Sequence, residues 1–362
     1  MVRILQVFYS MNMGGAENFI MNVYRKIDRS RIQFDFAVHD SRSGFFDDEI
    51  RALGGEIFCF PRFKGLNFIA YKKAWKSFLK NSRHYAVHAH MQSTASIYLK
   101  IARKHNIKTI CHSHTTSYGK GVKSIGKRLL QKNIGKFADI KLACGHAAGE
   151  WLYGKQSDFT VVKNGIDSQR FLFCGAVREK KREELGLGGK LVIGHAGRFD
   201  RAKNQSFLID VFADYQKLNR ESALLLIGDG ESRKSLEERV RRMGLADYVK
   251  FLGIRKDVNE LFMAMDCFVF PSVFEGLPLT LVEAQASGLP CVVSDAVSAE
   301  SKITESVVFE SLKSPLSVWS GRIEKSRDDT RAAKNQQVKE HGFDVQSVAD
   351  GLSELYAAVR HG

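Results

Sequence analysis

Two carboxylates stand eight residues apart, at Glu275 and Glu283, on either side of a turn that opens a helix. A buried strand is predicted over 267–270, and the apolar spacing over 279–286 predicts a helix. Glu275 is therefore expected in the loop and Glu283 on the helix. At that separation one carboxylate can accept hydrogen bonds from a sugar ring while the other accepts them from a ribose. The pattern favours a binding site for a nucleotide sugar.

The residues between the two carboxylates offer a second kind of ligand, the unpaired backbone amide. Gly276 and Leu277 form the turn, and the N–H groups near Leu279 and Thr280 stand at the start of the predicted helix. Such N–H groups have no partner within the helix and carry partial positive charge. They suit a diphosphate lying between the two carboxylates.

Two cations, Arg198 and Lys203, follow a predicted strand over 191–194 and precede a predicted helix. Cations in a loop are most often simply solvated, but a preorganised pair can neutralise the charge of a departing diphosphate. No Asp-x-Asp motif, a common means of holding Mg²⁺ or Mn²⁺ against a diphosphate, occurs in the chain. The cations and the helix N-terminus would then replace the metal, so we expect no metal and no cofactor.

Two H-x-H pairs, His88 with His90 and His112 with His114, lie at or beyond the ends of predicted strands. Alternate residues share a face there, and ligands of open α/β sheets bind outside such carboxyl ends. Three interpretations stay open, namely structural histidines, a substrate-facing role for at least one ring, and metal ligation. Metal ligation is disfavoured because no Asp or Glu lies nearby in the sequence and no H-E-x-x-H motif occurs.

Apolar strand-like runs alternate with helical patterns along most of the chain, which predicts an α/β protein with doubly wound parallel sheets. At 362 residues and 44% hydrophobic content, the chain can bury two cores of ordinary domain size. No run approaches the roughly 20 apolar residues that span a bilayer, and the first residues lead into a strand, not a signal peptide. The six cysteines lack C-x-x-C spacing and read as reduced core residues. We expect a soluble, cytoplasmic protein.

Four motifs in this order resemble those of the retaining glycosyltransferases of family 4, whose fold is the two-domain GT-B architecture. The carboxylate pair matches the family's E-x7-E signature, and Met13-Gly14-Gly15-Ala16-Glu17 looks like its glycine-rich first turn. Residues 162–167 look like its interdomain segment, and the stretch 197–204 is similar to its Arg and Lys pair for the donor diphosphate. Each motif alone is weak, but four in the correct order are specific. The resemblance thins after about residue 295, and the tail 301–337 is polar and irregular.

The resemblance implies two Rossmann-like doubly wound domains that face each other across a cleft. Residues 1–168, completed by a C-terminal helix at about 345–362, would form an acceptor-binding domain. Residues 169–344 would form the domain that binds the nucleotide-sugar donor.

Roles for individual residues also follow from the resemblance. Glu275 would hold hydroxyls of the transferred sugar, Glu283 would hold the ribose, and the Arg198 and Lys203 pair would stabilise the leaving diphosphate. His114 lies in a segment similar to the family's His-Thr motif and would stand beside the transferred sugar. The register of that motif keeps His112 as the alternative.

The glycines would let backbone approach the donor. Gly14 and Gly15 would line the diphosphate, where a Cβ would block close approach. The nucleobase pocket would be formed by two loops that end strands, at Gly228 and at Gly253, Ile254 and Arg255. Retention without an obvious nucleophile would imply a front-side displacement, in which the leaving phosphate takes the acceptor proton.

Positive charge is concentrated in the first half of the chain. Lys and Arg minus Asp and Glu gives 28 − 12 = +16 for residues 1–170, but 27 − 28 = −1 for residues 171–362. Residues 57–138 contain 17 Lys or Arg and no acidic residue, and include basic amphipathic stretches at 67–83 and 120–136. Such a surface suits an anionic membrane. Nucleic acid is the competing anion, but no helix-turn-helix, RRM or KH signature occurs, so we expect no nucleic-acid partner.

These features predict a retaining, metal-independent glycosyltransferase of bacterial capsule or exopolysaccharide assembly. It would move a sugar from a nucleotide sugar, with UDP as the expected nucleotide, to a glycan linked to polyprenyl diphosphate. It would lie in the cytoplasm, attached peripherally to the inner face of the plasma membrane. Three alternatives stay open: a transferase acting on a soluble sugar, a GT-B UDP-sugar epimerase and a non-catalytic anion-binding protein.

Overall fold

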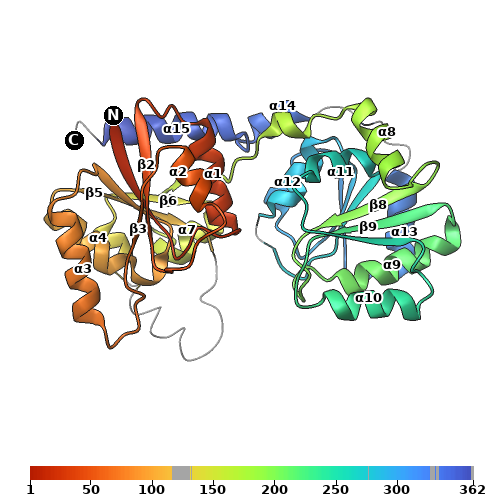
Figure 1. The fold of residues 1–362 in the computed structure, drawn as a ribbon. Helices are drawn as coiled ribbons and strands as arrows, with labels where there is room; N and C mark the ends of the chain where they lie inside the picture. The colour runs from red at the N-terminus through yellow and green to blue at the C-terminus, as the bar shows by residue number, and fades with distance from the viewer. Residues whose placement is uncertain (116–130, 132, 276, 327–330, 332–333, 360–362) are drawn as a thin grey trace. The chain divides into compact units, whose positions relative to one another are not determined.

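The computed structural model describes residues 1–115, 131, 133–275, 277–326, 331 and 334–359 (Figure 1). The chain forms two compact units, the first made of Met1–Gly165 with Val345–Gly362 and the second of Ile166–Asp344. The boundary between the units lies after Gly165, close to the boundary expected after residue 168. Every helix among the described residues is too short or too polar to span a bilayer.

A parallel sheet of seven strands forms the centre of the N-terminal unit, in the order β3-β2-β1-β4-β5-β6-β7. The strands are β1 (Val2–Val7), β2 (Ile32–Val38), β3 (Ile57–Cys59), β4 (Ala86–Ala89), β5 (Lys108–Ser113), β6 (Ile140–Ala143) and β7 (Thr160–Val161). The strands β1, β2, β4 and β5 are almost wholly buried, as expected of a parallel sheet that helices cover on both faces, whereas the edge strands β3 and β7 are more exposed.

Two helical layers cover this sheet. α1 and α15 pack on one face, where Phe19 and Leu352 share a core with Ile4, and α3 and α4 pack on the other, where Trp75 and Tyr98 meet neighbouring strand residues. The helical elements are α1 (Gly15–Lys26), α2 (Asp47–Ala52), α3 (Phe68–Lys80), η1 (Gln92–Thr94), α4 (Ala95–Lys104), α6 (Ile134–Phe137), α7 (His146–Tyr153) and α15 (Val345–Ala358). The C-terminal helix thus belongs to the first unit.

A parallel sheet of six strands forms the centre of the second unit, in the order β10-β9-β8-β11-β12-β13. The strands are β8 (Leu191–Ala196), β9 (Ser222–Ile227), β10 (Val249–Gly253), β11 (Cys267–Phe270), β12 (Cys291–Ser294) and β13 (Val307–Glu310). The helical elements are η2 (Ser168–Phe171), α8 (Gly175–Glu184), α9 (Gln205–Leu218), α10 (Arg233–Arg242), α11 (Val258–Ala264), α12 (Leu279–Ala286), η3 (Ala299–Ser301), α13 (Leu316–Lys325) and α14 (Asn335–Glu340).

Both sheets have the doubly wound strand order of Rossmann-like domains, so the expected fold class is confirmed. In each sheet the order reverses beside the first strand of the unit, between β1 and β4 and between β8 and β11. Ligands of such sheets bind outside the carboxyl ends of the strands at these reversals. The loops that leave β8 and β11 are therefore the first place to examine.

Two details of the sequence interpretation are wrong. The tail 301–337 is not irregular, because it contains β13 and α13, whose Trp319 and Ile323 are fully buried. The cysteines are all free, but Cys59 and Cys174 are exposed and are not core residues. They end an edge strand and precede a helix, positions at which a small apolar side chain need not be buried.

Gly228 allows two strand-ending loops to touch, and we predict that Gly228→Ala destabilises the protein. Its φ is +130°, and a Cβ there would overlap the carbonyl oxygen of Gly197. Strain and overpacking together should cost on the order of 2 to 5 kcal/mol of unfolding free energy, measured by urea denaturation. The matched control is Gly321→Ala in α13, where a Cβ meets no atom within 4 Å and should stabilise the helix by about 0.5 to 1 kcal/mol. Equal stability of the two variants would contradict this account of Gly228.

Candidate functional site

The loops that follow β8 and β11 are joined by backbone and side-chain hydrogen bonds. The Val273 N–H donates to the Ala202 carbonyl (2.9 Å), and the Asn204 side chain donates to the Pro271 carbonyl (3.2 Å). Asn204 has a left-handed conformation (φ +57°) and precedes the first residue of α9. The Asp200 carboxylate accepts from the Lys203 N–H (3.0 Å) and so closes the first loop on itself. These bonds fix where Lys203 stands relative to the second loop.

Lys203 and Glu275 form an ion pair at the centre of this arrangement. Nζ of Lys203 lies 2.6 Å from Oε1 of Glu275 and 4.6 Å from the centroid of the Phe270 ring. The two side chains are 15% and 24% exposed, so the pair is shielded but can be reached by a ligand. The backbone of Glu275 is fixed as well, since its carbonyl accepts from the Ser298 N–H (3.2 Å). A bound phosphate can take the place of Glu275 as the partner of Lys203. A sugar hydroxyl can take the place of Lys203 as the partner of Glu275.

Arg198 stands in the same loop with an exposed side chain. Its carbonyl accepts from the Gln205 side chain (2.8 Å), which also lies 3.2 Å from Nε2 of His195. Nδ1 of His195 donates to the Val269 carbonyl (2.9 Å), and burial lowers the pKa of this ring to about 4. The neutral, buried His195 thus supports the loop through Gln205, which contacts both the His195 ring and the Arg198 carbonyl. The sequence analysis missed His195, although it stands only three residues before Arg198.

Glu283 projects from α12, as the helical spacing predicted. Its side chain is partly exposed but surrounded by protein, and this burial raises the pKa of Glu283 to about 7. Arg170, on η2 against which α12 packs, lowers this pKa in part. The sequence analysis also missed Arg170, which follows the segment 162–167 by a few residues and carries no motif of its own.

The start of α12 presents backbone N–H groups. The helix begins at Leu279 after Pro278, and no side chain caps it at that position. Leu279 and Thr280 are half-buried, and Leu277 packs against the core of the unit. Gly276 lies outside the described residues. The amides of the first turn are thus available to an anion, as their position in the sequence indicated.

The two loops expected to hold the nucleobase are in contact with each other. Gly253 has a left-handed conformation (φ +68°), and its carbonyl accepts from the Gly228 N–H (2.8 Å). The Arg255 guanidinium lies 2.6 Å from Asp257 and holds the pKa of that carboxyl well below its usual range. Ile254 is 69% exposed. Backbone groups and the apolar Ile254 side chain therefore remain for a base, while the Arg255 side chain is paired.

At the glycine-rich first turn a carboxylate occupies the position expected for an anion. Gly14 precedes α1, and the Glu17 carboxylate folds back so closely that a Cβ on Gly14 would overlap it. Burial raises the pKa of Glu17. Around Gly15 a Cβ would meet no atom within 4 Å. A diphosphate near Gly14 would require Glu17 to turn away.

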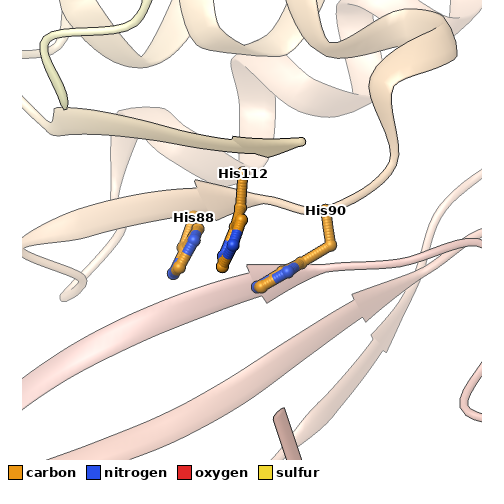
Figure 2. Close-up of side chains that lie close together, drawn as sticks. All are labelled: His88, His90 and His112. Carbon is orange, nitrogen blue, oxygen red and sulfur yellow. The ribbon is translucent and has the colours of Figure 1, made fainter. Parts of the chain in front are cut away.

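The histidines of the H-x-H pairs come together on one face of the N-terminal sheet: Figure 2 shows His88, His90 and His112, and His114 lies against His90 and His112. His88 pairs in register with Gln6 on β1 and Ile110 on β5, which places His90 and His112 on the same face. Nδ1 of His90 lies 2.8 Å from Nε2 of His114. His112 is fully buried and His114 is half-buried, so exposure favours His114 as the ring that a ligand can reach.

The burial of this cluster keeps its rings neutral. Burial lowers the pKa of His88 and of His114 to about 3, and it lowers the pKa of His90 and His112 as well. A neutral imidazole can donate at one nitrogen and accept at the other. The cluster therefore offers lone pairs and single N–H donors, and no positive charge, to a ligand.

Comparisons with known proteins agree with this interpretation of the fold. Residues 13–170 match the family model "Glycosyltransferase Family 4", and residues 177–311 match "Glycosyl transferases group 1". The EpsF protein of Bacillus subtilis (strain 168) is 34% identical over 373 residues, which cover 98% of this chain and 96% of EpsF. The chain belongs to the family 4 glycosyltransferases of GT-B fold.

Two further relatives are bacterial glycosyltransferases. The Escherichia coli "UDP-Gal:alpha-D-GlcNAc-diphosphoundecaprenol alpha-1,3-galactosyltransferase" is 28% identical, with 73% of this chain and 72% of that protein covered. The capsular polysaccharide glycosyltransferase CapH of Staphylococcus aureus is 23% identical over 98% of this chain and 99% of CapH. The crystal structure of Anabaena HepE with UDP superposes with a TM-score of 0.82 at 21% identity, covering 99% and 100% of the two chains.

The raised pKa of Glu283 predicts that nucleotide binding strengthens as the pH rises through about 7, because only the carboxylate accepts from both ribose hydroxyls. UDP affinity, measured by calorimetry between pH 6 and 8, should rise in the parent protein with release of a proton. In Glu283→Gln only the titration of UDP itself should remain, with affinity about 10- to 100-fold lower above pH 7.

The same substitution, Glu283→Gln, should weaken UDP binding but increase the unfolding free energy. A carboxyl whose folded-state pKa is raised loses stability as it ionises, so the loss begins above its unfolded value of 4.5 and is complete above about 7. Glu283→Gln should therefore gain about 1 to 3 kcal/mol of unfolding free energy at pH 8 and little at pH 5. If Glu283→Gln had the UDP affinity and the stability of the parent protein, Glu283 would neither bind ribose nor be a buried carboxylate that destabilises the fold when ionised.

Proposed function

We propose that this chain is a retaining, metal-independent glycosyltransferase that moves a sugar from a UDP-sugar to a glycan on polyprenyl diphosphate. The observation that carries the proposal is the Lys203–Glu275 ion pair beside α12, because it combines a cation for phosphate, a carboxylate for sugar hydroxyls and helix amides in one unit. Glu283 on α12 then supplies the carboxylate for a ribose.

UDP is supported as the donor nucleotide by two comparisons. The E. coli relative is named for UDP-Gal and for an acceptor on diphosphoundecaprenol. HepE, of the same fold, has been crystallised with UDP and with UDP-glucose. The backbone of Gly253 and the exposed Ile254 side chain suit a nucleobase, which needs an edge to hydrogen-bond and a surface to stack on.

Transfer would proceed as a front-side displacement. The bond between the sugar anomeric carbon and the β-phosphate oxygen breaks, the acceptor oxygen bonds to that carbon from the same face, and the acceptor proton passes to the leaving phosphate. Arg198, Lys203 and the first amides of α12 stabilise the charge that develops on the diphosphate, a role worth roughly 10²- to 10³-fold in rate. Glu275 holds the sugar hydroxyls, and His114 stands beside the transferred sugar.

The acceptor side of the proposal rests on the surface around α3. Leu66, Phe68 and Ile69 are 104%, 43% and 81% exposed at the start of this helix, whereas Tyr71, Trp75 and Leu79 of the opposite stripe are buried. Four lysines follow the exposed apolar tip along α3: Lys72, Lys73, Lys76 and Lys80. The second basic stretch at 120–136, with Lys120, Lys123, Lys127, Arg128 and Lys132, lies largely outside the described residues.

An anionic bilayer fits this surface better than a soluble partner. Exposed apolar side chains can enter the interface while lysines contact lipid phosphates, each contributing about 1 kcal/mol near the surface. Peripheral attachment of this kind would hold the N-terminal unit where a polyprenyl-linked glycan is found.

Donor turnover is tested by release of nucleotide from UDP-, GDP- and ADP-sugars in the presence of EDTA. We expect hydrolysis or transfer with a UDP-sugar, lowered at least about 10²-fold in Glu275→Ala, because that variant loses the sugar ligand and frees Lys203. The control is Glu238→Ala on α10, whose carboxylate is exposed and distant in sequence from the site. Complete loss of turnover on chelation, restored by Mn²⁺, would refute the metal-independent mechanism.

Membrane attachment is tested by cosedimentation with phosphatidylglycerol vesicles and with neutral phosphatidylcholine vesicles. The parent protein should bind the anionic vesicles at low salt and dissociate at high salt. The double variant Leu66→Ser with Ile69→Ser should bind at least about 10-fold more weakly at the same net charge. Leu218→Ser, which removes a 65% exposed leucine from the other unit, should bind as the parent does. Equal binding of all three proteins, or equal binding to both vesicles, would contradict the assignment.

A further inference from the structure

Several nitrogens of the four-histidine cluster are buried without a hydrogen-bond partner. They are Nε2 of His88, both ring nitrogens of His112 and Nδ1 of His114. Of the eleven such side-chain atoms among the described residues, four belong to this cluster. The Val162 backbone influences the pKa of His112 but does not reach hydrogen-bonding geometry with the ring. An unmet buried polar atom costs about 1 to 3 kcal/mol, so four in one place require an explanation.

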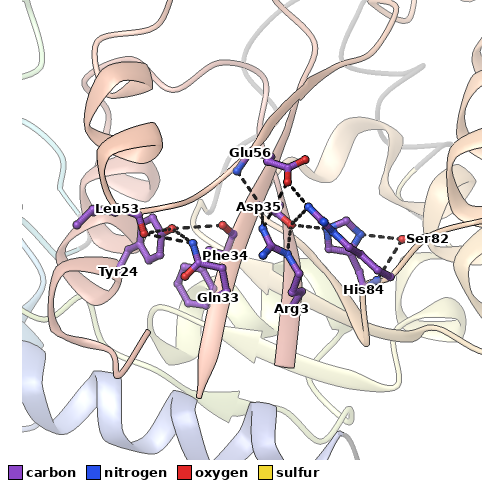
Figure 3. A network of polar contacts seen from close by, with 10 residues as sticks. Arg3, Tyr24, Gln33, Phe34, Asp35, Leu53, Glu56, Ser82 and His84 are labelled. Carbon is purple, nitrogen blue, oxygen red and sulfur yellow. Dashed lines mark hydrogen bonds and ion pairs between the residues drawn. The ribbon is translucent and has the colours of Figure 1, made fainter. Parts of the chain in front are cut away.

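The buried polar network around Asp35, in the same unit, has its partners. Asp35, in the middle of β2, accepts from Nε of Arg3 (2.7 Å) and from the Glu56 N–H (2.8 Å), and it lies 2.9 Å from Nε2 of His84 (Figure 3). These partners lower the pKa of Asp35. Tyr24 and Gln33 complete the network nearby. Elsewhere in the described part of this unit, atoms without a partner occur singly, at Trp75, Gln131 and Asn164, whereas four are gathered in the histidine cluster.

The hydrogen bonds that do exist fix the tautomer of His90 and show which nitrogen of His88 faces the other rings. The Oε1 atom of Gln6 can only accept, so Nε2 of His90 (2.9 Å) carries the proton and Nδ1 of His90 has a lone pair. Nδ1 of His88 contacts the Tyr356 hydroxyl (2.7 Å), which leaves Nε2 of His88 directed at the other rings. Gln6 and Tyr356 thus hold two rings by one nitrogen each; the second nitrogen of His88 has no partner, and that of His90 contacts only His114.

We propose that His88, His90 and His112 form a binding site for one transition-metal ion of the Zn²⁺, Co²⁺ and Ni²⁺ class. One ring nitrogen from each residue lies within 4.8 Å of the others (Figure 2). With metal–nitrogen bonds of about 2.1 Å, tetrahedral ligands stand roughly 3.4 Å apart, so small side-chain rotations close the site. His114, whose Nε2 already lies 2.8 Å from His90, is placed to become a fourth ligand.

The ligand type decides which ions fit. Neutral imidazole suits zinc, cobalt, nickel and copper, whereas Mg²⁺ and Ca²⁺ take oxygen ligands, and no carboxylate belongs to the described cluster. The low pKa values of the rings mean that no proton competes with the ion at neutral pH. Gln6 and Tyr356 would orient the histidines of the site, as outer hydrogen-bond partners do for metal-bound histidines in other proteins.

An ion at this position would change the surroundings of His114, the ring proposed to stand beside the transferred sugar. Nδ1 of His90 cannot bind the ion and accept from His114 at once, so occupancy breaks that hydrogen bond. The ion would also join β4 to β5 and, through Gln6 and Tyr356, to β1 and α15. The site belongs to the N-terminal unit alone, and its existence does not depend on the proposed function.

The test uses the full-length protein after EDTA treatment and removal of the chelator, titrated with Co²⁺. We expect one ion per chain, a visible absorption band of tetrahedral intensity that Zn²⁺ abolishes, and a higher melting temperature with either ion. His88→Asn and His90→Gln each preserve the nitrogen that contacts Tyr356 or Gln6 and delete the proposed ligand, so both should lose the band. The control His146→Asn alters an exposed histidine of the same unit and should keep it.

Tyr356→Phe provides a finer test, because losing an outer partner typically weakens a metal site by about 10- to 100-fold without removing a ligand. The absence of a visible band in the parent protein would overturn the proposal, whatever the variants do. A band of full strength in His88→Asn, or its loss in His146→Asn, would overturn the assignment to these residues. Nucleotide release in EDTA is measured separately, so failure of the metal site and failure of the donor site are distinguished.

Discussion

The parallel direction of all strands is the constraint on which both units depend. It brings every loop that leaves a carboxyl end to one edge of each sheet, and the reversal of strand order makes the loops after β8 and β11 neighbours. Lys203 and Glu275 are far apart in sequence, yet this topology and the bonds from Val273 and Asn204 bring them to 2.6 Å. A cation and a carboxylate thereby become available to one ligand.

The buried ionisable groups are of two kinds, those with hydrogen-bond or charged partners and those without. Where partners are provided, as at Asp35, the charged form is stabilised and the group serves the fold. Where they are missing, as at Glu283 and in the histidine cluster, burial favours the neutral form and leaves the group ready for a ligand. The partial attraction of Arg170 for Glu283 does not offset that burial. A ribose, which brings hydroxyl donors to the carboxylate, would offset it.

The sequence was informative where periodicity is local and weak where contacts are distant. Apolar spacing located β11 at Cys267–Phe270 and α12 at Leu279–Ala286, because each buries a regular stripe. The H-x-H spacing identified faces but not the register that brings residues from β4 and β5 together. α13 was missed because its buried stripe is only Trp319, Ser320 and Ile323 in a polar stretch. His195 and Arg170 act through contacts that no local motif reveals.

The uneven charge of the chain separates two electrostatic roles. Residues 171–362 carry a net charge of −1, so stabilisation of a diphosphate there must come from a few fixed groups and not from the overall field. Residues 1–170 carry +16, which acts over a distance but is screened beyond about 8 to 10 Å at physiological salt. Salt would therefore weaken approach to an anionic acceptor or membrane much more than it weakens the shielded contact between Lys203 and its partner. Under the proposed function, encounter with an anionic surface and stabilisation of the diphosphate would thus depend on different residues, in different units of the chain.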